Sequence, residues 1–117
     1  MKRISGHWSK VVLALSLMAE VAHAGMANGH INEIVSYPSG SALINVNGSY
    51  TDAPACNVYV SAGYNRFNID TTSATGRAVY ATLLTAMHAG TGVFVGGDGT
   101  CKDGAEGVTY TFSWPSP

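Results

Sequence analysis

The alternation of apolar and polar positions predicts a pair of strands near the start of the chain. Residues 29–37 (GHINEIVSY) and residues 41–48 (SALINVNG) each place apolar side chains between polar ones, as half-buried strands do. Between them stand Pro-Ser-Gly, residues 38–40, which are residue types that favour turns. A connection this short predicts that the two strands form a hairpin.

Three further segments carry strand patterns. Residues 57–70 alternate valines with polar side chains and resume at Phe67 and Ile69, which predicts a third strand that could break at Gly63. Residues 93–95 (VFV) form a short β-branched and aromatic run that ends in a glycine-rich turn. Residues 107–114 (GVTYTFSW) alternate most regularly and predict the last strand.

The pattern over residues 76–90 predicts a single helix. Its large apolar positions recur with the spacing i, i+3, i+4, i+7, at Tyr80, Leu83, Leu84 and Met87. Hydroxyl side chains at residues 71–75 can cap its start, and Gly90 stands where a left-handed C-terminal cap is expected. We expect the apolar stripe to face the core of the sheet.

The order of three strands, one helix and two strands predicts a mainly β fold with one helix. We expect a five-stranded OB-fold-like antiparallel barrel of order β-β-β-α-β-β, with the helix closing one end. Another small α+β sandwich with the same element order is the alternative, because periodicity does not reveal which strands pair.

The first 24 residues have the pattern of a signal peptide. Three basic residues precede a short apolar run, and Ala22-His23-Ala24 provides the small residues of a cleavage site. The apolar run is too short for a transmembrane anchor, which is the alternative interpretation. We expect residues 1–24 to be removed, residues 25–117 to form a single domain of 93 residues, and the protein to be secreted or periplasmic.

Two cysteines remain after the leader, Cys56 and Cys101. An even number of cysteines in an exported chain predicts a disulfide. A pair of free buried thiols and a metal site are the alternatives, although a zinc site would need further ligands at short spacing.

Charge excludes two classes of partner. Residues 25–117 keep three cationic and six anionic side chains, a net charge of −3 with neutral histidines. Without a basic patch, the chain lacks the cationic side chains that would bind the phosphate backbone of nucleic acid. We therefore expect no nucleic-acid partner. We also expect no membrane insertion after signal cleavage.

A family resemblance rests on the helix and the strand after it. The residues that carry it are Tyr80, Leu83, Leu84, Ala86, Gly90, Val93, Gly99, Thr100 and Cys101. This pattern resembles a group of small, mostly uncharacterised secreted bacterial proteins and, more distantly, the binding (B) subunits of AB5 toxins of the subtilase-cytotoxin type. The distant resemblance implies an OB-fold, a pentameric ring and sialylated-glycan ligands. It transfers no sugar-binding residue to this chain.

One region combines aromatic rings with polar donors. The candidate ligand-binding residues are Tyr59, Tyr64, Asn65, Arg66 and Asn68. Rings, amides and a guanidinium are the groups that bind a sugar or a small polar ligand, and OB barrels bind ligands on the face of strands two and three. A solvated strand face is the alternative.

No catalytic motif emerges from the histidines or carboxylates. His30 and His88 lack partners at catalytic or metal-binding spacing. Asp98 and Asp103 could bind calcium in the glycine-rich loop, but aspartate and glycine are equally what a tight turn needs. We expect no enzyme activity, no metal and no cofactor.

The second face of the helix suggests self-assembly. It carries small residues and threonines in place of lysine and glutamate, at Ala78, Ala81, Thr82, Thr85 and Ala89. A chain poor in charge throughout would show the same face without assembling. The sequence thus favours a binding module, a possible homo-oligomer with a glycan or protein partner. A structural or protein-interaction protein of the periplasm or cell surface is the alternative.

Overall fold

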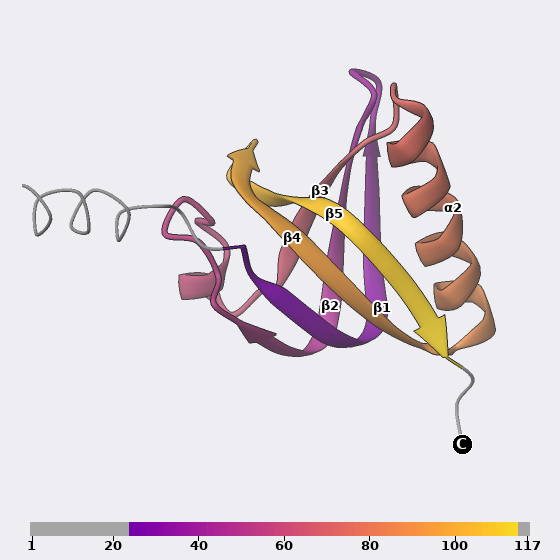
Figure 1. The fold of residues 1–117 in the computed structure, drawn as a ribbon, viewed down its shortest axis with the longest axis horizontal. Helices are drawn as coiled ribbons and strands as arrows, with labels where there is room; N and C mark the ends of the chain where they lie inside the picture. Colours follow the sequence, from indigo (N-terminus) through magenta and orange to yellow (C-terminus); the bar gives the residue numbers. More distant parts are fainter. Residues whose placement is uncertain (1–23, 115–117) are drawn as a thin grey trace, which may run out of the picture.

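The computed structural model describes residues 24–114, so the predicted leader lies almost wholly outside the described residues. The chain forms β1 (Met26–Tyr37), β2 (Ser41–Thr51), a 3-10 turn η1 (Val60–Ala62), β3 (Arg66–Asp70), α2 (Ala74–Ala89), β4 (Gly92–Lys102) and β5 (Ala105–Trp114). Figure 1 shows the five strands wrapped around one another with α2 along one side. The mainly β fold with one helix is confirmed.

The strands form one mixed sheet that closes on itself in the order β1-β2-β3-β5-β4, with β4 returning to β1. Every neighbouring pair is antiparallel except β3 and β5, which run parallel where Phe67 faces Glu106 and Asn68 faces Gly107. The prediction of a purely antiparallel sheet is therefore wrong at this one seam. Directions that alternate around a ring of five cannot alternate at every seam, so one parallel pair is unavoidable.

Two tight turns connect neighbouring antiparallel strands, one between β1 and β2 and the other between β4 and β5. The predicted hairpin at residues 38–40 forms, with Gly40 at a φ of 88°. The turn between β4 and β5 consists of Asp103 and Gly104, whose φ angles of 54° and 78° fit a two-residue hairpin loop. Strand β4 extends through the glycine-rich residues 96–99, for which the sequence predicts a turn.

The third strand is shorter than predicted. Residues 57–65 form a loop around η1, in which the side chain of Asn57 accepts a hydrogen bond from the backbone N–H of Tyr59. Val58 and Val60 are 61% and 41% exposed, so these two alternating valines do not belong to the buried face of a strand. This local hydrogen bonding competes with the strand that the valines suggest.

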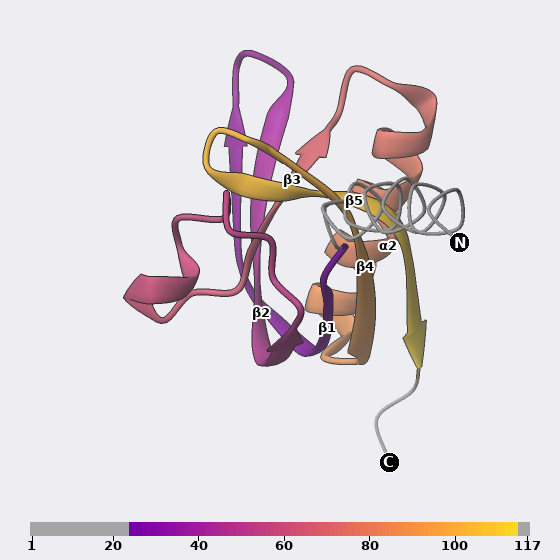
Figure 2. The same ribbon diagram turned by 60° about the vertical axis from the view of Figure 1, so that its left-hand side comes forward.

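Helix α2 turns a different face to the sheet than expected. Ser73 caps its start by accepting a hydrogen bond of 2.9 Å from the Gly76 N–H, and Gly90 ends it in the left-handed conformation. The buried positions are Val79, Leu83 and Ala86. Figure 2 shows the helix from a second side, against the strands that it covers.

The predicted stripe is therefore only partly correct. Leu83 is fully buried, and Tyr80 is half-buried, sharing a hydrogen bond of 2.9 Å with the Ser36 hydroxyl of β1. Leu84 and Met87 are 45% and 39% exposed. The small side chain of Ala86 lets the helix approach the sheet on that side, which rotates Leu84 and Met87 toward solvent.

The predicted disulfide between Cys56 and Cys101 is present, with Cα atoms 5.9 Å apart. It links the loop after β2 to the end of β4, two segments separated by 45 residues. The loop and the β4–β5 turn are thereby held together on one side of the sheet.

Candidate functional site

Three of the five predicted ligand-binding residues gather around one guanidinium. The Arg66 guanidinium carbon lies 4.8 Å from the ring centre of Tyr59 and 4.5 Å from that of Tyr64. Its Nε and Nη2 atoms donate hydrogen bonds of 3.0 and 2.7 Å to Glu33 Oε1 on β1. The Arg66 cation thus contacts the faces of two tyrosine rings and is neutralised by the Glu33 carboxylate. These contacts hold both rings in place.

The two predicted asparagines serve the backbone and the sheet. The Asn65 side-chain amide donates to the carbonyls of Val46 and Gly48. Asn68 is buried and donates to the hydroxyl of Ser41 on β2, at 2.7 Å. Neither amide group is available to a ligand in the way that the sequence suggests.

A groove lies over the outer face of β2, beside the cluster of Tyr59, Tyr64 and Arg66. Its volume is about 330 Å³, and it is lined by Tyr37, Ser39, Leu43, Tyr59 and Asp103. Leu43 is absent from the core cluster although it is only 3% exposed. Tyr37 and Ser39 come from the β1–β2 turn and Asp103 from the β4–β5 turn, so two distant turns and the η1 loop form the walls.

Polar groups in this groove are free to bind. Tyr37 is 45% exposed, and its hydroxyl makes no hydrogen bond to any described residue. The same holds for the Ser39 hydroxyl and the Asp103 carboxylate, within residues 24–114. The Tyr59 hydroxyl donates a weak hydrogen bond of 3.3 Å to the Asp103 carbonyl. A carboxylate, hydroxyls and tyrosine rings around an apolar floor are suited to a polyhydroxylated ligand.

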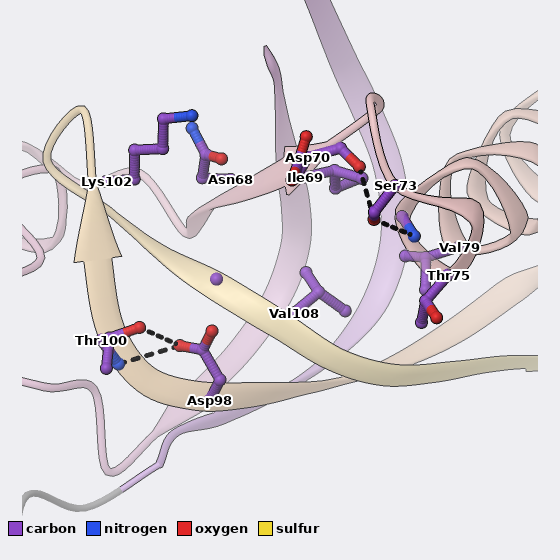
Figure 3. A pocket seen from close by; sticks show the side chains of 12 residues that line it. Asn68, Ile69, Asp70, Ser73, Thr75, Val79, Asp98, Thr100, Lys102 and Val108 are labelled. Carbon is purple, nitrogen blue, oxygen red and sulfur yellow. Dashed lines mark hydrogen bonds between the residues drawn. The ribbon is translucent and has the colours of Figure 1, made fainter. Parts of the chain in front are cut away.

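A second cavity of about 280 Å³ lies between the end of β3, the start of α2 and the β4–β5 hairpin. Figure 3 shows the hydrogen bonds of Asp98 in this cavity. Asp98 accepts hydrogen bonds from the N–H and hydroxyl of Thr100, at 2.8 and 2.9 Å. Hydrogen bonds from Thr72 lower the pKa of Asp70 below its ordinary value. One oxygen of each carboxylate is therefore already engaged by a neighbouring threonine.

Sequence reasoning missed Tyr37, Ser39 and Asp103 as groove residues. The sequence places each of them at a strand end or in a turn, which is where each lies. The signal that could have found them was the proximity of the β1–β2 and β4–β5 turns in a closed sheet. That proximity depends on strand order, which the sequence does not reveal.

No metal-binding cluster emerges from the part of the chain that the structure describes. His30 lies exposed on β1 and His88 in the last turn of α2. No three His, Cys, Asp or Glu side chains within residues 24–114 are grouped so as to hold a metal ion. Asp98 and Asp103, considered as calcium ligands, line two different cavities. None of the described helices has the length and apolar character needed to cross a membrane.

A row of aromatic rings lies on the outer surface of β4 and β5. The ring of Phe94 stacks on Phe112 at 5.1 Å and lies 5.9 Å from the ring of Tyr110. Tyr110 and Phe112 are 49% and 51% exposed. The Tyr110 ring covers Gly96, where an added Cβ would come within 2.4 Å of it. These three rings form an exposed aromatic ridge across the pair of strands β4 and β5.

The chain matches no protein-family model, no curated protein and no solved structure in the comparisons made.

Proposed function

We propose that the exported chain is a non-enzymatic binding module that holds a glycan in the groove over β2. The observation that carries this proposal is the groove itself. It presents the free hydroxyls of Tyr37 and Ser39 and the free carboxylate of Asp103 beside the ring of Tyr59. Sugars bind proteins through hydroxyl–carboxylate hydrogen bonds and through stacking on aromatic faces.

The proposal includes an OB-type fold for the closed sheet. The five strands, the ring closure and the position of α2 between β3 and β4 support it. OB folds bind oligosaccharides on the face of strands two and three and on the loops that join strands one to two and four to five. The groove over β2 uses that face and those two turns.

Assembly into a homo-oligomer through α2 is part of the same proposal. The outer side of the helix exposes Ala78, Ala81, Thr85 and Ala89, with Thr82 beside them. The hydroxyls of Thr82 and Thr85 donate to carbonyls one turn earlier, at 3.0 and 2.8 Å, so this face presents few free donors. Exposed Leu84 and Met87 add apolar area beside it. The resemblance to toxin binding subunits favours a ring.

A protein-interaction role is the second candidate, and the aromatic ridge favours it. Phe94, Tyr110 and Phe112 form a stacked, half-exposed surface of the kind that is enriched at protein interfaces. Under this alternative the partner would be a protein, and the groove over β2 would hold no small ligand.

Binding of the purified exported protein to a glycan array tests the first candidate. Asp103→Asn removes the charged acceptor, and asparagine tolerates the positive φ of that turn. Its loss of a charge-assisted hydrogen bond should weaken binding about tenfold or more. Asp98→Asn, in the cavity of Figure 3, is the matched control and should bind as the wild type does. An array without a single bound glycan argues instead for the protein-interaction role.

A further inference from the structure

Glu106, near the start of β5, is fully buried. Its Oε2 accepts hydrogen bonds from the backbone N–H groups of Gly25 and Gly99, at 2.9 and 2.8 Å. Its Oε1 accepts a hydrogen bond of 2.6 Å from the Tyr50 hydroxyl. Both oxygens therefore accept hydrogen bonds, yet every donor belongs to a neutral group.

A buried carboxylate normally has a cationic partner. Removing an ion from water is costly, and buried charges in proteins are paired or neutralised. Within residues 24–114 the single ion pair is that of Arg66 with Glu33, on the surface of the sheet. No lysine, arginine or histidine of the described chain is paired with Glu106.

Gly25 is placed where such a partner would be needed. It is buried, while Ala24 before it is exposed. Its carbonyl accepts a hydrogen bond of 2.8 Å from the Gly97 N–H, which holds it against β4. A Cβ at Gly25 would come within 2.6 Å of the Tyr50 ring and 2.7 Å of Glu106 Oε1. Any larger residue here, directly after the predicted cleavage site, would force the Tyr50 ring or the Glu106 carboxylate to shift.

We propose that removal of the leader between Ala24 and Gly25 creates the missing cation, the α-ammonium group of Gly25, as a buried partner for Glu106. A signal peptidase hydrolyses the peptide bond with one water. The hydroxyl goes to the Ala24 carbonyl, and a proton goes to the Gly25 nitrogen. At neutral pH the new amine takes a second proton from solvent and carries one positive charge. This nitrogen already lies 2.9 Å from Glu106 Oε2 in the uncleaved chain.

Processing and folding are coupled by this pair. In the precursor, the Gly25 nitrogen beside Glu106 is a neutral amide, whereas in the mature chain it is a charged ammonium group. A charge-assisted hydrogen bond is about twice as strong as a neutral one. The inference rests on the predicted leader and is independent of the glycan site, so either can fail without the other.

Amine labelling of the exported protein tests this pair. Lys102 is the sole lysine after residue 24, so the mature chain has two amines, the α-amine of Gly25 and the ε-amine of Lys102. An accessible α-amine has the lower pKa and reacts first with an acylating reagent near pH 7. We expect the opposite order in the folded protein, with Lys102 labelled first and Gly25 at least about tenfold slower than in urea.

Glu106→Gln is the matched variant, since it keeps the shape of the side chain and removes its charge. It should restore fast labelling of Gly25, and inserting an alanine after Ala24 should do the same by moving the amine outward. If Glu106→Gln prevents folding, the labelling order of the wild type and of the insertion variant decides. Preferential labelling of Gly25 in the folded wild type, or an intact mass that shows a different first residue, would overturn the proposal.

Discussion

At the scale of single residues, Tyr50 joins the core to the buried carboxylate. Its ring packs on that of Phe67, with centroids 4.8 Å apart, and its hydroxyl donates to Glu106. The side chain of Asn57 donates to the same hydroxyl, at 3.1 Å. Burial, first, and the hydrogen bond to Glu106, second, raise the pKa of Tyr50 well above its ordinary value.

This raised pKa predicts a loss of stability in alkali. The unfolded chain ionises Tyr50 near pH 10, and the folded chain does not. The contribution of the protonated hydroxyl is therefore complete below about pH 10 and is lost as the pH rises further. Between pH 8 and pH 11, urea denaturation should show the wild type losing about 1 kcal/mol more than Tyr50→Phe. Tyr64→Phe, on the exposed cluster, should lose as much as the wild type; equal losses in all three proteins would contradict the role of Tyr50.

At the scale of elements, α2 offers a matched pair of leucines. Leu83 is fully buried, while its neighbour Leu84 is 45% exposed. Leu83→Ala should lower the free energy of unfolding by about 3 kcal/mol because it leaves a cavity between helix and sheet. Leu84→Ala should cost less than about 1 kcal/mol, as surface substitutions do. Chemical denaturation compares them, and similar losses would mean that the helix faces the sheet as its apolar spacing alone suggests.

The same helix shows how far the sequence reaches. Its existence, its hydroxyl cap and Gly90 at its end follow from local chemistry, and they are confirmed. The face that it buries depends on how closely Ala86 lets it approach the sheet, which is a tertiary property. Likewise, the hairpin at residues 38–40 was predictable, but the valines at 58 and 60 misled, because Asn57 engages the local backbone instead.

The candidate site was predictable only in part for a related reason. Aromatic rings and Arg66 in one short segment indicated a polar surface, and three of the five residues do lie together. Asp103 and Tyr37 join the neighbouring groove through the closure of the ring. No periodicity along the chain encodes that closure.

At the scale of the whole molecule, the disulfide links the loop after β2 to the end of β4, two segments that are far apart in the sequence. Cys56 and Cys101 tie the η1 loop region to the end of β4 across a separation of 45 residues. Cys101→Ser should destabilise the chain by about 2–4 kcal/mol, since the unfolded state gains freedom. The shift in melting temperature measures this loss. A variant that melts with the wild type would show that the bridge contributes little to the fold.

Self-assembly is tested at the same scale. Ala81→Glu together with Thr85→Glu places two charges on the outer face of α2, where we expect the subunits to meet. Light scattering should show a multimer for the mature wild type and a folded monomer for this variant. Val58→Glu, on the 61% exposed loop residue, is the control and should leave the mass unchanged. A wild-type mass near that of one 93-residue chain would contradict assembly.

Backbone amide mapping by NMR tests the central claim most directly. The ¹⁵N-labelled mature protein is titrated with glycans from the array or, if the array gives none, with sialylated oligosaccharides. The groove predicts that the largest chemical-shift changes fall at Tyr37, Ser39, Tyr59 and Asp103. Changes centred on Asp98 and Lys102, or on Phe94 and Phe112, would contradict the groove as the ligand site, and a spectrum that no glycan alters would contradict glycan binding.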